Sequence, residues 1–560
     1  MVKRKVSTNG DVKGSKKTKN EKPGMGKLQV TTPGETFGSL LGKVSIETFM
    51  KENWEQKFLH IKREDQEYYG SLFSLEGLKE IVEEEELFFE RDINCCRYVD
   101  GEKELLNEGE EISLKDLNEL LDKKKATLQF HQPQRFEDGL WNLMEKLETH
   151  FNSLVGANVY ITPAESQGLA PHCDDVEIFV LQLEGKKTWK LYEPHVKLSR
   201  DYTQDLLQDA IGEPIYECTL EPGDMLYFPR GTIHQAKTFG DSHSTHISMS
   251  TFQNHCVGDF MDHAVRMAIE NAMEDDVTFR QGLPLNYRNF LGTQRDMSKY
   301  VEDDKEDKMS NEKDTEVMKF KKRIKDYLSK LVDHIDVNKA ADAMSSDFIG
   351  SRLPPFGHAP PEVDENEAEP PTLDCQIKMR YPEHVRVMYL DEDTEDDEDD
   401  ELEIVEDDEQ GDESMEQEEE EKKPAKGAKK NGKEEKDEKP SDEKTSSAKK
   451  TKEKRRSKTA SEVEDDEDND QDAEMTETEY PCIAFVHSLN NERDAHMCGP
   501  QPKMDPSMIK LPVHFARAAN FILNAKDFVK VKDIPDLEED NEKLLLATSL
   551  FADDIIEMKF

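Results

Sequence analysis

The stretch "CTLEPGDMLYFPRGTIHQA", residues 218–236, decides the fold class. Its Pro-Gly pair at 222–223 is a strong turn signal. The run "MLYFP" is short and apolar, as a buried strand requires, and "PRG" at 229–231 marks a second turn. The stretch therefore predicts three short strands joined by two turns. Short strands with glycine and proline turns at this density indicate a β-barrel or sandwich.

Three side chains near this stretch have the types and spacing of metal ligands. "APHCDDVEIF" (170–179) places His172 and Asp174 two residues apart, and His234 follows the second turn of the deciding stretch. Alternate residues of a strand share a face, with α-carbons roughly 6–7 Å apart, so one ion could contact both side chains. Two histidines and one carboxylate are typical of non-haem Fe(II) oxygenases, in which three coordination positions stay open. Zinc is disfavoured because no cysteine lies at a matching spacing.

A lysine near the metal ligands is a candidate for binding a co-substrate. "IFVLQLEGKKTWKLYEP" (178–194) predicts a strand pair turning at Gly185, and Lys187 opens the second strand. If 2-oxoglutarate supplies the electrons, its far carboxylate needs a buried cation, and Lys187 beside Trp189 fits that role. Lys187 could equally be a surface turn lysine, and Lys186 is the competing candidate.

Two further predicted strands carry polar side chains on one face. These are Asn158 and Tyr160 in "NVYITP", and His246, Ser248 and Ser250 in "HSTHISMS". Buried polar groups must find partners, so a polar face inside a barrel fits a ligand cavity. Exposure of these faces to solvent is the alternative.

Composition separates an acidic insertion from the globular parts. The chain has 560 residues and a formal net charge of -49, and the stretch from Asp391 to Glu421 is mostly Asp and Glu. Such a run repels itself and is expected to be disordered. No apolar run has the roughly 18–20 residues that span a bilayer, so no membrane association is expected. Eight irregularly spaced cysteines indicate reduced thiols in a reducing compartment.

The sequence divides into five parts. We expect a basic tail (1–30), a globular β domain (31–256) and a helical domain (257–345). A small domain in two pieces (346–390 and 479–560) follows, and an insertion (391–478) interrupts it. "HVRVMYL" (384–390) and "CIAFVHSL" (482–489) predict strands, so the insertion is expected to be a long hairpin loop, which loop entropy tolerates. Helices and a hairpin suggest a winged-helix-like module. Its acidic surroundings argue against direct nucleic-acid binding.

The helical part carries an apolar stripe at intervals of three and four residues. Its members are Val317, Phe320, Ile324, Tyr327, Leu328, Leu331 and Ile335. The stripe predicts one helix that packs in the core or pairs with a second copy of the chain. Basic segments in the tail and in the insertion are candidate nuclear or nucleolar localisation signals, or ordinary solvated low-complexity sequence.

Taken together, these motifs closely resemble the JmjC-domain ribosomal oxygenases of the Myc-induced nuclear antigen (MINA) type. The resemblance is carried by the stretches at 158–194, 221–236 and 243–254, and it extends to "FHQPQRF" (130–136), "IGSRLPP" (349–355) and "VHSLNNERDAHM" (486–497). It covers almost all of 30–390 and 479–560. Cys173 departs from the family, which carries tyrosine there. We expect this side chain to point away from the metal ligands.

The resemblance implies a mixed α+β chain with a double-stranded β-helix (cupin, JmjC) domain, a helical dimerisation domain and a winged-helix C-terminal domain. It implies Fe(II) at His172, Asp174 and His234, 2-oxoglutarate at Lys187, Asn158 and Ser248, and O₂ as oxidant. The implied substrate contacts are Tyr160, Gln129, Gln132, Asn94 and Ser250. The implied reaction is β-carbon hydroxylation of a histidine in a large-subunit ribosomal protein, by a nuclear or nucleolar homodimer.

Two alternatives remain open from sequence. A histone lysine demethylase could use the same iron centre, although a trimethyl-lysine pocket favours an aromatic cage over amide and hydroxyl groups. A non-catalytic scaffold could use the acidic insertion to bind basic nuclear proteins such as ribosomal proteins or histones.

Overall fold

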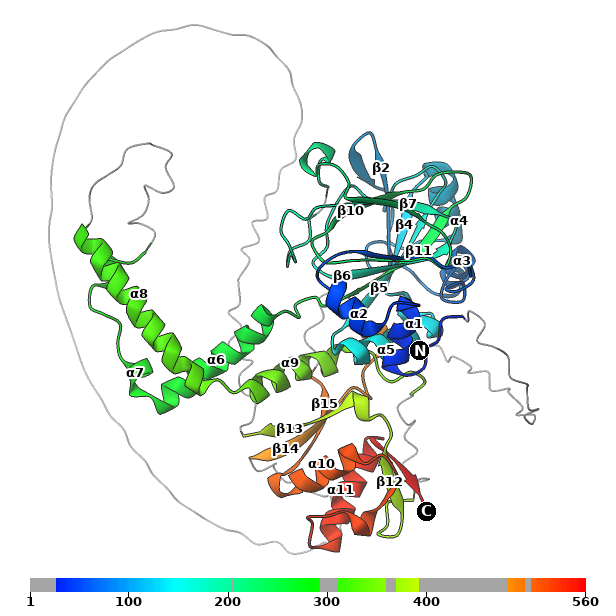
Figure 1. The fold of residues 1–560 in the computed structure, drawn as a ribbon. Coiled ribbons are helices and arrows are strands. Elements are labelled where there is room, and N and C mark those ends of the chain that lie inside the picture. The colour runs from blue at the N-terminus through cyan, green and yellow to red at the C-terminus, as the bar shows by residue number, and fades with distance from the viewer. Residues whose placement is uncertain (1–26, 204, 293–310, 359–368, 392–480, 499–504) are drawn as a thin grey trace, which may run out of the picture. The chain divides into compact units, whose positions relative to one another are not determined.

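The computed structural model describes six segments of the chain, residues 27–203, 205–292, 311–358, 369–391, 481–498 and 505–560 (Figure 1). Most of the predicted basic tail, and the predicted insertion after residue 391, lie outside the described residues. No helix within the described residues has the length and apolar character to cross a bilayer.

Two antiparallel sheets form the N-terminal domain. The larger has the strand order β1-β9-β6-β11-β5-β4-β2-β3 and the smaller β10-β7-β8. The strands of the larger sheet are β1 (Leu59–Ile61), β2 (Ile93–Val99), β3 (Glu102–Leu105), β4 (Thr127–His131), β5 (Val155–Thr162), β6 (Glu177–Glu184), β9 (Met225–Phe228) and β11 (Ser244–Thr251). Those of the smaller are β7 (Lys187–Tyr192), β8 (Tyr216–Leu220) and β10 (Ile233–Lys237).

The three strands predicted in 218–236 are confirmed as β8, β9 and β10, and they alternate between the two sheets. The predicted turn at Gly185 is also present, but the prediction that its flanking strands pair with each other is wrong. β6 pairs with β9 and β11, whereas β7 pairs with β8 and β10. Gly185 has a φ of 58°, and a β-carbon there would lie 1.9 Å from the carbonyl oxygen of His243. Only glycine fits this crossover from one sheet to the other.

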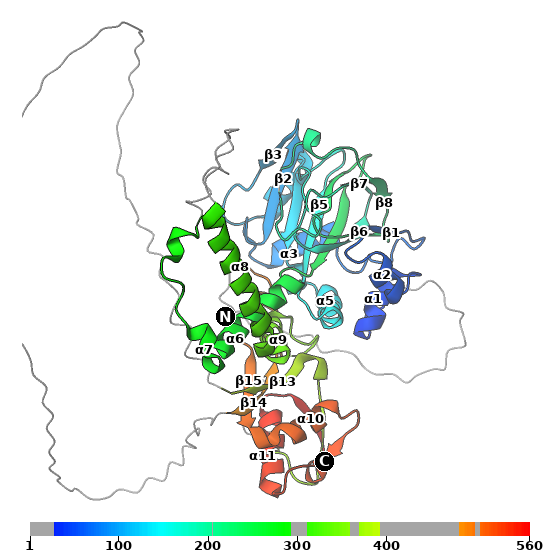
Figure 2. The same cartoon turned by 60° about the vertical axis from the view of Figure 1, so that its left-hand side comes forward.

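Side chains of the larger sheet alternate between two environments, as the period of two in a strand requires. Phe179 of β6 and Tyr227 of β9 point to a helix-covered core, where Trp54 stacks on Tyr227. Ile178 and Val180 point the other way, into a second core with residues of the smaller sheet. The helices of this domain are α1 (Pro33–Leu41), α2 (Ile46–Glu52), α3 (Leu75–Glu84), α4 (Leu114–Glu119) and α5 (Asp138–Phe151), of which α1, α2 and α5 lie together (Figures 1 and 2).

In the part that the structure describes, four α-helices follow, α6 (Val257–Asp275), α7 (Val277–Arg280), α8 (Asn311–Leu331) and α9 (Val337–Ser351). The predicted stripe lies on α8 except for Ile335, which comes after the helix ends. Leu331 is buried against α6, but Ile324 and Leu328 are exposed in the single chain. The predicted domain boundary at 345/346 falls inside α9.

The C-terminal part contains two three-stranded sheets, β13-β14-β15 and β16-β12-β17. Its elements are β12 (Gln376–Met379), β13 (Val385–Leu390), β14 (Cys482–His487), β15 (Ser507–Pro512), α10 (Ala516–Asn524), β16 (Val529–Lys530), α11 (Asp540–Ala552) and β17 (Ile556–Lys559). The predicted pairing is confirmed, since Leu390 of β13 lies opposite Cys482 of β14. The predicted insertion therefore joins two adjacent strand ends.

Buried pairs of a histidine and a glutamate connect helix α5 to the C-terminal part. His384 binds Glu145 across 2.7 Å, and His496 binds Glu148 across 2.8 Å. Burial lowers the pKa of His384 to about 4, and the carboxylate of Glu145 opposes this effect. Arg352 is buried beside the same acids and donates to the carbonyl oxygen of Glu383. Charges this deeply buried are tolerated only when they are paired and hydrogen-bonded.

Candidate functional site

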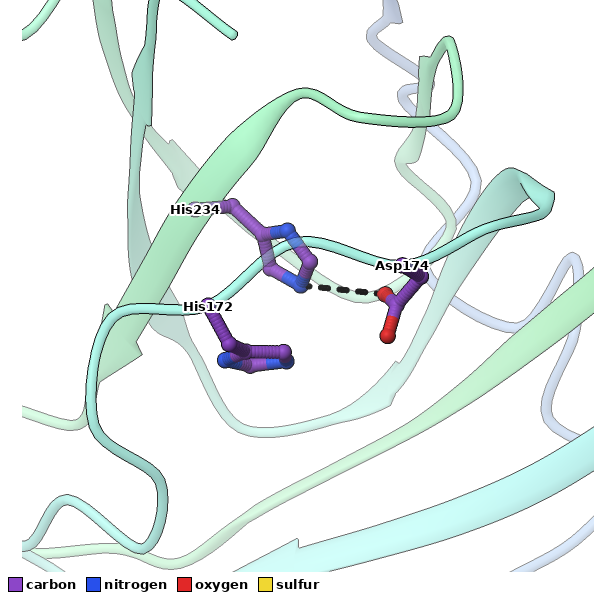
Figure 3. Close-up of side chains that lie close together, drawn as sticks. All are labelled: His172, Asp174 and His234. Carbon is purple, nitrogen blue, oxygen red and sulfur yellow. Dashed lines mark ion pairs between the residues drawn. The ribbon is translucent and has the colours of Figure 1, made fainter. Parts of the chain in front are cut away.

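His172, Asp174 and His234 converge between the two sheets of the N-terminal domain (Figure 3). One ligand atom from each side chain lies within 4.8 Å of the others. Nε2 of His234 is 3.6 Å from Oδ2 of Asp174, and the two imidazole centroids are 4.2 Å apart. We refer to these three residues as the triad. Among the described residues, this is the one group of three or more such side chains close enough to hold a metal ion.

The hydrogen bonds of the two histidines fix which ring nitrogen carries the proton. Nδ1 of His172 contacts the carbonyl oxygen of Ala170 at 2.8 Å, and Nδ1 of His234 contacts that of Thr232 at 3.1 Å. A carbonyl can only accept, so both Nδ1 atoms donate and both Nε2 atoms keep a lone pair. Burial lowers the pKa of His234 to about 4, which keeps its ring neutral. Ring nitrogens from two histidines and one carboxylate suit a divalent transition metal.

The backbone around the triad differs from the predicted strand. His172 and Cys173 precede β6 and form only isolated bridges, to His234 and Thr203 respectively. These bridges keep the segment extended, so the alternation that places His172 and Asp174 together persists. The side chain of Cys173 contacts Oγ1 of Thr203 at 3.0 Å and lies in a separate apolar cluster, away from the triad.

A cavity of about 120 Å³ contains the triad and Lys187. Only 5% of Lys187 is exposed, and its Nζ donates to Oγ1 of Thr162 over 2.9 Å. Burial lowers the pKa of Lys187 to about 7. Lys186, the competing candidate, points outward, with 58% of its side chain exposed and an ion pair to Glu221. Among the described residues no carboxylate pairs with this buried amine, which therefore fits an anionic ligand.

The cavity also holds most of the other predicted residues. Asn158, Tyr160, Ser248 and Ser250 all line it. A larger cavity of about 520 Å³ adjoins it and shares four lining residues with it, Tyr160, Leu169, His172 and Asp174. Asn94 and Gln129 line the larger cavity, where Gln129 donates to the hydroxyl of Tyr160 over 3.0 Å.

Gln132 is placed differently from the prediction. Its φ is 44°, directly after β4 ends, and this left-handed backbone turns the side chain away from the sheet. Nε2 of Gln132 donates to the carbonyl oxygen of Met497 over 2.9 Å, and the residue lines neither cavity. Gln132 thus connects the N-terminal domain to the segment after β14.

Sequence reasoning missed several residues of the cavities. His131 lies in the larger cavity, and Thr127 and Ala236 lie in the smaller one beside Trp189 and His246. His246 stacks on Tyr160, with ring centroids 5.0 Å apart. His131 could have been found, since it shares a face of β4 with Gln129 under the alternation that selected Asn158 and Tyr160.

Comparison with known proteins agrees with this fold and site. A family model for the JmjC domain matches residues 129–258, which include the whole triad. Ribosomal oxygenase 2 of Rattus norvegicus is 39% identical over 379 residues, 66% of this chain and 76% of the relative. The Bos taurus protein of that name is 42% identical, over 64% of this chain and 73% of the relative. Human ribosomal oxygenase 1 is 36% identical over 57% of this chain and 48% of the relative.

These matches define a JmjC protein of mixed α and β structure with a cupin-type core. The chain belongs to the ribosomal oxygenase family, and the resemblance stated from its motifs is confirmed. Among solved structures, Escherichia coli YcfD, a ribosomal oxygenase in complex with cobalt and 2-oxoglutarate, is 14% identical, with a TM-score of 0.35 over 62% of this chain and 82% of YcfD. Membership of the family accordingly depends on the sequence relatives and the JmjC match.

Proposed function

We propose that this chain is an Fe(II)- and 2-oxoglutarate-dependent oxygenase that hydroxylates the β-carbon of a histidine in a large-subunit ribosomal protein. The observation that carries the proposal is the triad, in which one ring nitrogen from each of two histidines and one carboxylate oxygen lie within 4.8 Å of one another. The relatives named ribosomal oxygenases supply the substrate class.

The triad would hold the iron. Bound iron, with 2-oxoglutarate and O₂, supplies the oxidising chemistry by which the co-substrate becomes succinate and CO₂ and one oxygen atom enters a substrate C–H bond. The protein positions the partners. Lys187 would bind the far carboxylate of 2-oxoglutarate, with Asn158 and Ser248 beside it, and burial would strengthen that ion pair.

The larger cavity is the proposed entrance for the substrate side chain. It opens onto the triad through His172 and Asp174, and Tyr160 lies at the junction of both cavities. Tyr160 and Gln129 in this cavity, and Ser250 in the smaller one, can hydrogen-bond to a substrate imidazole and exclude water from it. This polar lining favours histidine over a trimethyl-lysine, which prefers a cage of aromatic rings.

The assay for this function uses purified full-length protein, Fe(II), 2-oxoglutarate and a panel of histidine-bearing ribosomal peptides. One peptide is expected to gain the mass of one oxygen atom, and fragment spectra are expected to place it on a histidine. Formaldehyde release from methylated histone tails, without oxygen gain on any ribosomal peptide, would favour the demethylase alternative instead.

The assembly and domain roles are also proposals. Residues 257–345 are the proposed dimerisation domain, and support comes from Met318, Ile324 and Leu328, whose apolar side chains α8 leaves exposed in the single chain. The segments 346–390 and 479–560 form the proposed winged-helix-like domain, which α10, α11 and the β16-β12-β17 sheet support. A monomeric mass at micromolar concentration would contradict the dimer.

The proposed location is the nucleus and nucleolus. Support comes from the basic segments within the predicted tail (1–30) and the predicted insertion (391–478), most of which lie outside the described residues. Fluorescently tagged protein lacking either segment is expected to spread into the cytoplasm.

A further inference from the structure

His131 lies at the centre of a chain of hydrogen bonds that ends in the cavity of the triad. Nδ1 of its ring is 3.0 Å from Oδ1 of Asn158, and Nε2 is 3.0 Å from Nδ2 of Asn94. Asn94 continues the chain, since its Oδ1 accepts from Nδ2 of Asn107 over 2.9 Å. Oδ1 of Asn107 in turn accepts from the backbone N–H of Cys95 over 2.8 Å.

The backbone end of this chain fixes the direction of every bond in it. The N–H of Cys95 can only donate, so Asn107 must present its oxygen there and its NH₂ group to Asn94. Asn94 then accepts with its oxygen and donates with its NH₂ to Nε2 of His131. Because Nε2 must accept, the proton of the neutral ring is on Nδ1, which donates to Oδ1 of Asn158.

The direction of the last bond decides what Asn158 offers the cavity. Its oxygen is engaged by His131, which leaves the NH₂ group of Asn158 for a ligand. Asn158 lines the cavity with the triad and Lys187, and among the described residues no partner binds its Nδ2. If His131 were protonated, its Nε2–H would face the NH₂ group of Asn94, and both groups are donors. Burial opposes this state because it lowers the pKa of the His131 imidazole.

We propose that His131 is a positioning residue. The hydrogen bonds that start at the Cys95 N–H make His131 donate to Asn158, and the NH₂ group of Asn158 then selects a ligand that offers a hydrogen-bond acceptor to it. An amide side chain can turn over at little cost when nothing holds it, and would then offer its oxygen. The chain of fixed bonds removes that choice. His131 touches neither the triad nor the ligand in this scheme, and acts through Asn158.

The chemistry of the acceptor deepens the proposed function and rests on it. 2-Oxoglutarate carries only acceptor oxygens on its carboxylates and keto group, so an NH₂ group at Asn158 matches it and an amide oxygen repels it. The orientation of Asn158 therefore complements the charge of Lys187 in the same cavity. The two contacts are independent, because the Asn158 orientation is set by the chain from Cys95 and not by the lysine.

The first test is the protonation state of His131 in the full chain without added metal, by ¹⁵N NMR of histidine-labelled protein. The signal is assigned by its loss in His131→Leu. We expect a neutral ring with the proton on Nδ1. A ring protonated on Nε2, or on both nitrogens, at pH 7.5 would overturn the proposal.

The second test reverses the chain at its far end. Asn107→Asp still accepts from the Cys95 N–H but cannot donate to Asn94, so Asn94 must turn over and present its oxygen to Nε2. His131 is then expected to move its proton to Nε2 or to become doubly protonated, although Asn107 does not contact His131 and is connected to it only through Asn94. Asn490→Asp, which adds the same charge at an exposed site bonded to Ser507, is the control and is expected to leave the ring unchanged. An unaltered His131 signal in Asn107→Asp would contradict the proposal.

The third test measures binding of 2-oxoglutarate to the metal-loaded protein by calorimetry. His131→Leu is expected to weaken binding about tenfold, the effect of about one lost hydrogen bond. His131→Asn retains a donor near the Nδ1 position and is expected to lose no more than about threefold. Equal affinity of His131→Leu and wild type would overturn the role in positioning. Failure of wild type itself to bind 2-oxoglutarate would reject the proposed function but leave the NMR result standing.

Discussion

Nζ of Lys187 donates to Oγ1 of Thr162 over 2.9 Å, in the cavity that also contains the triad. Thr162 also accepts from Thr127, so the amine is held at the end of a small hydroxyl network that carries no charge. A buried ammonium with only neutral partners is poorly stabilised. A ligand carboxylate in this cavity would supply the missing counter-charge.

Replacement of Lys187 by methionine is expected to weaken 2-oxoglutarate binding by about 10- to 100-fold. A charge-assisted hydrogen bond contributes about 1.5–3 kcal/mol, and the methionine keeps most of the packing. The matched control is Lys186→Met, which removes an exposed lysine paired with Glu221 and should change binding less than twofold. Calorimetric titration of the metal-loaded variants measures both, and a similar loss in the two would refute the assignment.

The affinity for 2-oxoglutarate is expected to fall as pH rises above about 7. Burial lowers the pKa of Lys187 to about 7, so the free protein carries a neutral amine above that pH, while the bound dicarboxylate favours the ammonium. Binding must then take up a proton, and Kd rises by up to about tenfold per pH unit until the pKa of the complex is reached. Below pH 7 this effect disappears.

Calorimetry at pH 8 in buffers of different ionisation enthalpy measures that proton uptake directly. Wild type is expected to take up close to one proton per ligand, and Lys187→Met close to none. No uptake by wild type would contradict the neutral lysine.

Metal binding is expected to distinguish two adjacent residues. Asp174→Ala removes one of three ligands and should lower Fe(II) affinity at least about 100-fold, given the cost of a lost ligand. Cys173→Ala, one residue away, changes a side chain that contacts Thr203 and should leave the affinity within about twofold. Anaerobic titration with Fe(II), or with Co(II) followed by its absorption spectrum, provides the measurement. Loss of metal in both variants would place Cys173 in the metal site.

Removal of one partner from the buried pair between α5 and the C-terminal part is expected to be costly. His384→Ala leaves Oε1 of Glu145 buried without its hydrogen-bond donor, while Lys146 still contacts Oε2, and should destabilise the protein by about 1–3 kcal/mol. His514→Ala breaks a largely exposed pair with Glu542 and should cost less than about 1 kcal/mol. Urea unfolding measures the difference, and equal costs would show that the buried pair has no special part in joining the two regions.

The pairing of His172 with Asp174 and the strands at 218–236 could be predicted from sequence because each depends on local signals. Residues two apart, a proline-glycine turn and an apolar run are visible in a short window. The strand pairing across Gly185 could not be predicted, because a turn glycine does not reveal which sheet receives the next strand. The direction of Gln132 depends on a left-handed backbone and on Met497, far away in the sequence. The boundary between the helical domain and the C-terminal part could not be predicted either, because helix α9 continues through the predicted position at 345/346.

Deletion of the insertion tests the scaffold alternative. Leu390 and Cys482 are paired, so a two-residue Asn-Gly turn in place of residues 392–480 can connect the strands. The shorter loop is expected to keep or slightly raise the melting temperature, since loop closure costs less entropy. Hydroxylation of a ribosomal peptide should persist with unchanged kcat. Loss of all activity, with the fold intact by circular dichroism, would show that the insertion takes part in the reaction.

The most direct measurement of the central claim is the mass of a histidine-bearing ribosomal peptide after incubation with the iron-loaded protein, 2-oxoglutarate and O₂, compared with the same reaction of His234→Ala. Wild type is expected to add one oxygen atom to a histidine and to form one succinate for each hydroxylation, whereas the variant forms neither. Absence of any oxygen gain across the large-subunit peptides, with iron bound at the triad in the wild-type protein, would contradict the account.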